Sequence, residues 1–168
     1  MLVYHPAFDA YHCVFRLVTI LDSRQTLEVD RLRILDFVLC FPAVVATFRL
    51  PQRAASIRKS AILADNAYRT PLNPRATFGA LSASQDGALA CLAAAGFVGP
   101  EGLRDGIAIR TSAFLPNVLL EQCNKLRDRE SLFFRQILPA FLDIPLLGHD
   151  GLKARSGLLE YRYDTVQA

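Results

Sequence analysis

The N-terminal segment carries the side chains that could most readily bind a metal ion. His5, Asp9 and His12 follow one another at spacings of four and three residues, which can place them on one face of a helix. Imidazole and carboxylate groups are common zinc ligands. Three ligands on one helix end would be unusual, however, and the spacing matches no standard zinc motif. We therefore expect these residues to have a structural role at a helix end and predict no metal site.

No other group of residues forms a recognisable catalytic motif. The sequence lacks the G-x-S-x-G signature of a nucleophile elbow. The glycine-rich stretch 99–106 (GPEGLRDG) has neither the Walker lysine nor the spacing of a dinucleotide-binding loop. The four cysteines stand far apart among apolar residues, so we expect reduced, buried thiols at Cys13, Cys40, Cys91 and Cys123. The sequence thus predicts a chain that is not an enzyme and needs no cofactor.

Basic residues form a second group of side chains that could bind a charged partner. Residues 37–85 contain six basic residues and one acidic residue, a local net charge of +5. The candidates for contact with phosphate groups, or with an acidic partner, are Arg49, Arg53, Arg58 and Lys59. Contacts with DNA phosphates would be weak, salt-sensitive and independent of base sequence. The alternative is an ordinary solvated helix face.

A helix predicted at 28–41 positions a third charged group. Acids at its start suit the helix dipole, and Pro42 cannot continue it. Its second half, 37–41, is uncharged and should lie in the core. Its first half carries Arg31, Arg33 and Asp36. We expect these three either to form a solvated, internally paired face or to help dock a partner protein.

The other segments predict an α+β fold that is mostly α. Apolar residues at helical spacing indicate helices at 7–22, 43–48, 53–66, 84–95, 115–126 and 130–142. Ser82 or Ser84 should cap the fourth of these, Gly96 should end it, and Pro139 should kink or end the last. Less regular structure is expected as an extended loop or short strand at 70–81, short strands at 97–98 and 107–111, a loop at 148–157 and a terminal strand at 158–164.

This order of three helices and a short hairpin is typical of a winged helix-turn-helix. We predict one compact domain over 1–168, divided into an N-terminal helix (1–25), a winged-helix core (26–111), and C-terminal helices with a strand (112–168). In many such folds the second helix of the turn reads DNA bases. Here that helix, 82–97, contains no Arg or Lys and includes Asp86, which leaves Gln85 alone to read bases. We expect this helix to pack against protein. A free-standing winged-helix DNA-binding regulator is the alternative.

The composition agrees with a cytoplasmic subunit. Hydrophobic residues make up 52% of the 168 residues, a high fraction for a monomer, so part of this surplus could contact a partner. No uncharged run approaches the roughly 18 apolar residues of a membrane span. The first 12 residues do not form a signal peptide.

Four stretches together resemble the small middle components of bacterial ABC-three-component systems, a group that includes the Lamassu-type defence systems. They are YHPAFDAYHCVFR (4–16), EVDRLRILDFVLCFP (28–42), TPLNPRATFGAL (70–81) and GLLEYRYD (157–164). The resemblance covers nearly the whole chain and depends on no catalytic motif, so it transfers no catalytic residue.

The resemblance implies a winged-helix adaptor. Such a protein would associate with an SMC- or Rad50-like ATPase and would position an effector, often a nuclease, in a complex that senses phage or plasmid DNA. ATP hydrolysis and DNA cutting would belong to the partners. This chain would meet DNA through the complex, weakly and without sequence preference.

Overall fold

The computed structural model describes residues 5–63 and 70–160. By contact density the chain forms two compact units, each built from two segments. Unit 1 comprises Met1–Asp36 and Ala80–Arg129, and unit 2 comprises Phe37–Gly79 and Glu130–Ala168. Each unit is described by itself below.

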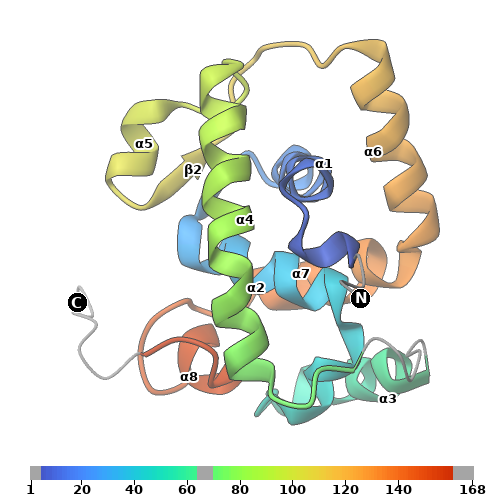
Figure 1. The fold of residues 1–168 in the computed structure, drawn as a ribbon. Helices are drawn as coiled ribbons and strands as arrows, with labels where there is room; N and C mark the ends of the chain where they lie inside the picture. The colour runs from blue at the N-terminus through green and yellow to red at the C-terminus, as the bar shows by residue number, and fades with distance from the viewer. Residues whose placement is uncertain (1–4, 64–69, 161–168) are drawn as a thin grey trace. The chain divides into compact units, whose positions relative to one another are not determined.

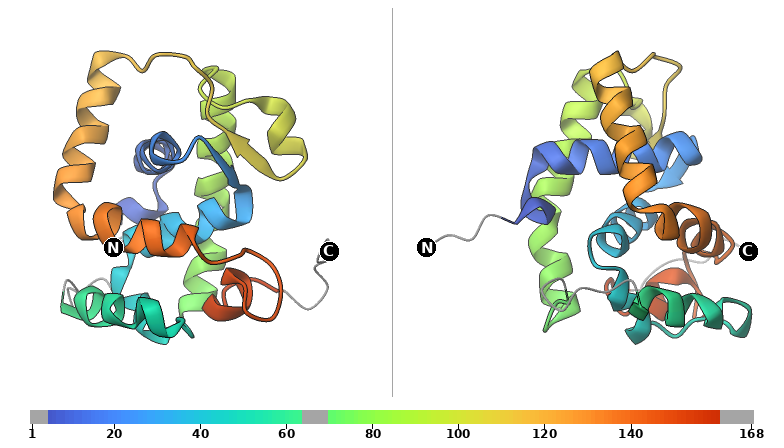
Figure 2. Two further views of the ribbon diagram at one scale, coloured as in Figure 1. Left: turned by 180° about the vertical axis from the view of Figure 1, so that it is seen from behind. Right: turned by 90° about the vertical axis from the view of Figure 1, so that its right-hand side faces the viewer.

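Three helical segments, at 10–23, 80–94 and 117–129, make up most of unit 1. A 3-10 turn, η1 (Pro6–Phe8), precedes α1 (Ala10–Ser23), as predicted for 7–22. Figures 1 and 2 show α1 between α6 (Asn117–Arg129) and the second half of α4 (Pro74–Ala94). Five consecutive α1 residues, Leu17 to Leu21, are fully buried. The core of unit 1 therefore lies around α1.

A two-stranded antiparallel sheet completes unit 1. Strand β1 (Thr26–Glu28) pairs with β2 (Ile107–Ile109), and the central pair of Leu27 and Ala108 is buried. The predicted strand at 107–111 is confirmed, but its main partner is β1 and not 97–98. A single bridge joins Val98 to Arg110. The glycine-rich stretch 99–106 contains a short helix, α5 (Pro100–Arg104).

Helix α2 (Val29–Cys40) confirms the helix predicted at 28–41, and the boundary between the units falls within it. Its second half forms part of the core of unit 2, as predicted, because Phe37 and Val38 are fully buried. In unit 2 the Phe37 ring lies 5.2 Å from Phe41 and 5.5 Å from Phe78 between centroids, an aromatic cluster within that core.

The extended loop or short strand predicted at 70–81 is wrong over most of its length. Helix α4 begins at Pro74 and continues without a break to Ala94. Proline is tolerated in the first turn of a helix, where its missing N–H needs no partner. The Asn73 carboxamide accepts a hydrogen bond from the Ala76 amide (3.0 Å) and so caps the start. Ser84 is no cap, because its hydroxyl donates to the Phe8 carbonyl. Gly96 (φ 76°) ends the helix as predicted.

The first segment of unit 2 winds through two 3-10 turns into a helix. These elements are η2 (Pro42–Thr47), η3 (Gln52–Ala54) and α3 (Ala55–Leu63). Ile57 and Ala61 are buried, as predicted, and η2 packs on α3. The end of the helix predicted at 53–66 lies outside the described residues.

The second segment of unit 2 is a helix with an irregular centre. A π-helical stretch (Phe133–Ile137, η4 by label) precedes α7 (Leu138–Leu142), with Pro139 in the first turn of α7. The helix does not end at Pro139, and the irregular stretch lies directly before it. The predicted loop at 148–157 contains a short helix, α8 (Leu152–Ser156), which ends at Gly157 (φ 66°). Most of the strand predicted at 158–164 lies outside the described residues.

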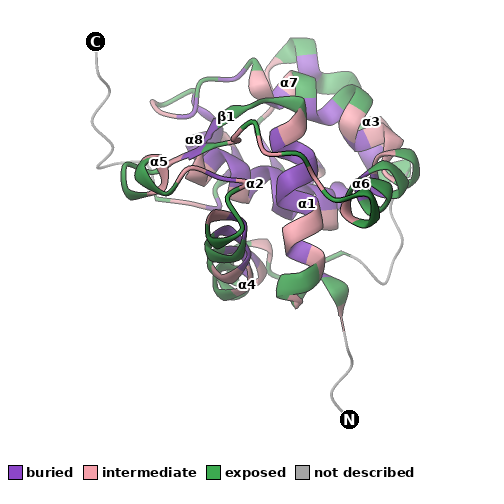
Figure 3. Ribbon diagram, turned by 90° about the horizontal axis from the view of Figure 1, so that it is seen from above, coloured by how far each residue is buried: buried purple, intermediate pink, exposed green. Residues whose placement is uncertain are grey.

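The described chain is thus mostly helical with one small sheet, which confirms the α+β, mostly α, prediction. Figure 3 shows the burial that results: α1 is largely buried, while α6 keeps an exposed outer face. None of the described helices is long and apolar enough to span a membrane.

Candidate functional site

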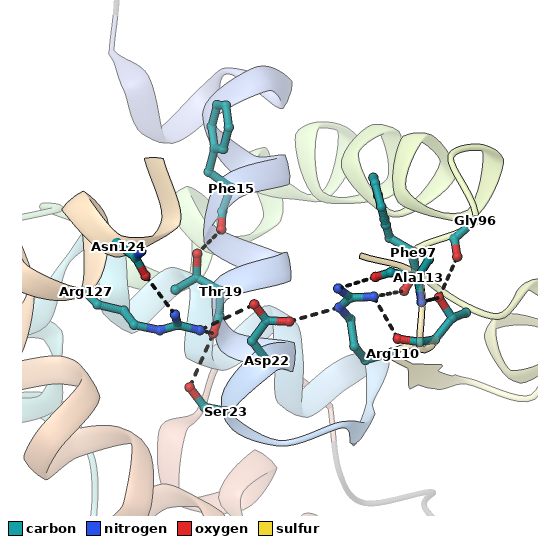
Figure 4. Close-up of polar contacts among 11 residues, drawn as sticks. Phe15, Thr19, Asp22, Ser23, Gly96, Phe97, Arg110, Ala113, Asn124 and Arg127 are labelled. Carbon is teal, nitrogen blue, oxygen red and sulfur yellow. Dashed lines mark hydrogen bonds and ion pairs between the residues drawn. The ribbon is translucent and has the colours of Figure 1, made fainter. Parts of the chain in front are cut away.

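An acidic side chain at the end of α1 joins two arginines of unit 1 (Figure 4). Asp22 accepts hydrogen bonds from Arg110 Nε (2.9 Å) and from Arg127 Nη2 (3.4 Å). Arg110 follows β2, whereas Arg127 lies in the last turn of α6. Asp22 therefore links three parts of unit 1 that are distant in sequence. Sequence analysis did not single it out, since no local pattern marks its two partners.

The Arg110 guanidinium donates hydrogen bonds to four residues. Its guanidinium donates to three backbone carbonyls in addition to Asp22, those of Phe97, Thr111 and Ala113. Its side chain is 9% exposed and lies 5.6 Å from the centre of the Phe97 ring. A guanidinium does not give up its proton in proteins, so this arrangement suits holding a loop in place and not proton transfer.

A pocket opens beside this network. Its volume is about 280 Å³, and its lining residues are Asp22, Gln25, Arg110, Thr111, Ser112, Ala113, Phe114, Leu115 and Leu120. Of the lining residues, Phe114 is 97% exposed and Leu120 is 41% exposed, and Val118, four positions after Phe114, is 74% exposed. We call Phe114, Val118 and Leu120 the apolar segment. Arg110 fixes its start through the Ala113 carbonyl.

The three charged residues predicted on α2 occupy different environments. Arg31 is 6% exposed and donates to Glu28 (2.8 Å). Burial raises the pKa of Glu28, but the hydrogen bond and charge of Arg31 outweigh burial, so the pKa lies below its ordinary value. Arg33 remains partly exposed and pairs with Asp86. Arg31 and Arg33 each pair with an acidic residue of unit 1, Arg31 in a buried position and Arg33 in a partly exposed one.

Asp36, the third of these residues, lies inside unit 1 with an exposed fraction of zero. Its carboxylate accepts from Arg16 Nε (2.5 Å) and from Gln85 Nε2 (2.9 Å). The expectation that Asp36 lies on a solvated or docking face is therefore wrong. A buried carboxylate needs such partners to offset its lost hydration. These lie 20 and 49 positions away in sequence, so helical spacing could not reveal them.

Helix α4 occupies the position at which a DNA-binding winged helix would read bases, and its polar side chains Gln85 and Asp86 are both engaged within unit 1. Gln85 is 1% exposed and is occupied by Asp36 and by the Arg33 carbonyl. Asp86 is exposed and paired with Arg33. Between Ala76 and Ala94 the helix has no Arg or Lys. Its exposed face is thus small, uncharged or acidic.

The predicted basic residues lie together in unit 2, with one further arginine. Arg49 donates from Nη2 to the Ala154 carbonyl (2.8 Å), and Arg155 donates from Nη1 to the Arg49 carbonyl (2.6 Å). Arg58 donates to the Phe48 carbonyl (2.7 Å). Lys59 is exposed on α3. Sequence analysis missed Arg155 because it lies in the predicted loop at 148–157.

A second pocket joins Arg155 to the remaining predicted residue, Arg53. Its volume is about 300 Å³, and its lining residues are Pro51, Arg53, Ile144, Pro145, Leu147, Gly148, Asp150, Gly151 and Arg155. Arg53 is exposed and donates to the Asp143 carbonyl (3.0 Å). Arg155 also donates to the exposed Asp150 carboxylate (2.9 Å). We call Arg49, Arg53, Arg58, Lys59 and Arg155 the basic surface.

His5 and Asp9, which the sequence offered as possible metal ligands, have structural roles. His5 Nδ1 accepts from the Ala7 amide, and Asp9 accepts from the Tyr11 amide, so both cap helix starts as expected. The described residues hold no cluster of three or more potential metal ligands. The four cysteines, all of them among the described residues, form no disulfide bond, but Cys91 is exposed and Cys40 half-buried, so the prediction of buried thiols is wrong for these two. Burial raises the pKa of the Cys123 thiol.

Comparison with protein families found one match. Residues 2–164 match the family described as ABC-three component (ABC-3C) system Middle Component 5. Curated proteins and solved structures returned no match. The match extends over nearly the entire sequence and includes both units. The chain therefore belongs to the Middle Component 5 family of ABC-three-component systems.

Proposed function

We propose that this chain is a non-catalytic adaptor. It bridges an SMC- or Rad50-like ATPase and an effector, such as a nuclease, in a cytoplasmic complex that defends against phages or plasmids. Membership of the Middle Component 5 family is the observation that carries the proposal, since a middle component of a multicomponent system has protein partners. ATP hydrolysis and cutting of foreign DNA belong to those partners.

Unit 1 is a winged-helix module in this proposal. Support comes from the order of its elements: α1, β1, α2, the second half of α4, the Val98 bridge, α5 and β2. The hydrogen-bonded order β1–β2 with a bridge from Val98 to Arg110 suits the small sheet of such a module. The α5 segment takes the place of the wing. Residues 37–79, which belong to unit 2, are inserted between its second and third helices.

The surface chemistry of α4 favours an adaptor over a free-standing DNA-binding regulator. Base recognition needs exposed donors and acceptors, most often from Arg, Lys, Asn or Gln. On α4, Gln85 is buried and the exposed Asp86 would repel phosphates. A face of this kind is suited to close packing with another protein.

The apolar segment is the surface that we assign to the ATPase. Phe114 and Val118 are 97% and 74% exposed, and large apolar groups of this kind anchor many protein interfaces. Because Arg110 holds the chain just before Phe114, little conformational freedom would be lost when a partner binds.

Co-expression with the ATPase encoded alongside this chain tests the assignment. Phe114→Asp with Val118→Asp should abolish co-elution in size exclusion at micromolar concentration. Both side chains are already exposed, so the lone subunit should keep its stability. Ile62→Asp with Leu72→Asp changes two exposed apolar residues of unit 2 and should leave co-elution intact. Separate elution of the unmodified proteins would reject the adaptor role itself.

Arg33 remains the candidate for a charged docking contact, and its pair with Asp86 permits a direct test. Arg33→Glu alone removes the internal pair and reverses the charge. Adding Asp86→Arg restores an internal pair with opposite polarity. If Arg33 docks a partner, both variants should weaken the complex. Recovery in the double variant would instead assign the pair to the stability of unit 1.

A further inference from the structure

The arginines of the basic surface are anchored by uncharged acceptors. Arg49, Arg53, Arg58 and Arg155 each donate to a backbone carbonyl, at distances from 2.6 to 3.0 Å. A carbonyl orients a guanidinium but carries no net charge, so it leaves the positive charge uncancelled. Asp150 is the exception, because it partly neutralises Arg155. The result is a group of oriented cations, of which Arg49, Arg53 and Lys59 are exposed and Arg58 and Arg155 are half-buried.

These cations are close together within unit 2. The Arg49 amide donates to the Arg155 carbonyl (3.0 Å), and the Arg155 side chain returns a bond to the Arg49 carbonyl. Arg53 and Arg155 line the same pocket. Arg58 is anchored on Phe48, the residue before Arg49, and Lys59 follows it on α3. Like charges at such short range are unfavourable until an anion approaches.

The charge of unit 2 increases this tendency. Unit 2 contains ten basic and six acidic residues, a formal net charge of +4, whereas unit 1 contains nine basic and ten acidic residues, a net charge of −1. A polyanion would therefore be attracted to unit 2 over a distance of about one Debye length, roughly 8 Å at physiological salt.

The residues between the cations distinguish a nucleic acid from an acidic protein. No large apolar side chain is exposed between Phe48 and Ser60, where the exposed residues include Gln52, Ala55 and Ser56, and the exposed Ile62 and Leu63 lie beyond the cations at the end of α3. Protein interfaces usually centre on an aromatic or aliphatic anchor. A phosphate backbone needs only cations and polar donors, and the guanidinium fork matches a phosphate bidentately.

We infer that the basic surface of unit 2 binds the phosphate backbone of duplex DNA without sequence preference, and that Asp150 weakens this binding by competing for Arg155. The inference deepens the proposed adaptor function and rests on it. A few phosphate contacts bind weakly alone, but a subunit held in a complex with other DNA contacts gains from their combined effect.

Fluorescence anisotropy of the full chain with two unrelated 20-base-pair duplexes tests the inference. Wild type should bind both equally, with a linear decrease of log affinity against log salt. Arg53→Glu with Lys59→Glu should lower affinity about tenfold or more, and should reduce the salt slope by about 0.9 for each phosphate that the variant no longer neutralises. Asp150→Asn should increase affinity several-fold. A merely structural role of Asp150 would not produce this gain.

A matched control separates the surface from net charge. Arg24→Glu with Arg104→Glu replaces two exposed arginines of unit 1 and also changes the net charge from +3 to −1. Equal weakening by both double variants, or no duplex binding by wild type at low salt, would overturn the inference. Binding of polyglutamate in preference to duplex would also overturn it, in favour of an acidic protein partner. Co-elution of each variant with the ATPase, measured in parallel, separates this failure from failure of the adaptor role.

Discussion

Units 1 and 2 differ in the acceptors that hold most of their arginines. In unit 1 five arginines pair with carboxylates: Arg16 with Asp36, Arg31 with Glu28, Arg33 with Asp86, and both Arg110 and Arg127 with Asp22. In unit 2 four arginines are anchored on backbone carbonyls, and Arg155 of these also pairs with the Asp150 carboxylate. The first arrangement uses the charge inside the unit, whereas the second keeps it available outside.

This difference predicts which arginines contribute to the stability of the fold and which are available to bind a partner. A buried ion pair fixes the position of two elements, and losing one partner leaves an uncompensated charge. An exposed cation on a carbonyl adds little to stability, because water replaces the lost bond easily. We therefore expect substitutions in unit 1 to act on folding and those in unit 2 to act on binding. Four measurements test this comparison.

The largest effect should come from Asp36→Ala. It leaves the Arg16 guanidinium and the Gln85 amide without their shared acceptor in a buried site, which should cost about 3–5 kcal/mol. Urea denaturation followed by circular dichroism measures the loss. Asp86→Ala removes a far more exposed partner and should cost no more than about 1 kcal/mol. Similar losses in the two variants would contradict the central position of Asp36.

Arg110→Ala should have the next largest effect, about 2–3 kcal/mol, because one largely buried side chain serves Asp22 and three carbonyls. Arg110→Lys keeps the charge but cannot reproduce the planar fork, so it should recover only part of the loss. Both should also weaken binding of the ATPase, since the apolar segment loses its anchor. Full recovery by lysine would show that charge alone is needed.

Arg53→Ala should change the free energy of unfolding by about 0.5 kcal/mol or less, because the side chain is exposed and donates to a single carbonyl. Arg16→Ala removes the same type of side chain from a buried site in unit 1. The two variants should therefore differ widely in their free energy of unfolding. Thermal denaturation of both variants under one condition makes the comparison. A loss of more than about 2 kcal/mol for Arg53→Ala would place this arginine among the structural ones.

The smallest effect concerns pH. The pKa of Glu28 is lowered in the folded chain, so its carboxylate stabilises the fold above the ordinary value of 4.5. That contribution decreases as the pH falls through the folded-state pKa, and it is absent in stronger acid. Its size is modest because the Glu28 side chain is 40% exposed. Glu28→Gln should flatten this part of the stability profile between pH 5 and pH 3, measured by urea titrations, and an unchanged profile would rule out the contribution.

Helices and their ends were predictable to the extent that their determinants are local. The spacing of apolar residues predicted α2 to within one residue at each end but started α1 three residues too early, in the 3-10 turn that precedes it, and Gly96 marked the end of α4. Local signals failed where one residue type occurs in two kinds of structure. Proline is excluded from a helix interior but is common at a helix start, and Pro74 lies at the start of α4, where Asn73 caps the helix.

The small sheet was harder to predict, because pairing joins distant segments. Val98 lies near 107–111 in sequence and was expected to be its partner, whereas Thr26–Glu28 provides the main ladder from about 80 positions away. A three-residue strand is too short to display the alternation that identifies longer strands. Sequence analysis consequently assigned part of β1 to the following helix.

The sequence by itself determined the helical character, the absence of a recognisable catalytic motif, the family, and the positions of the basic residues. Only the tertiary structure decided what each charge does. Asp36 and Arg53 both appear in helical segments with polar neighbours, yet one is buried against Arg16 and Gln85 and the other is exposed on a carbonyl. The physical reason is distance along the chain. The donors to Asp36 and the acceptor for Arg53 lie between 20 and 90 positions away, and helical periodicity reports only on neighbours three or four residues apart.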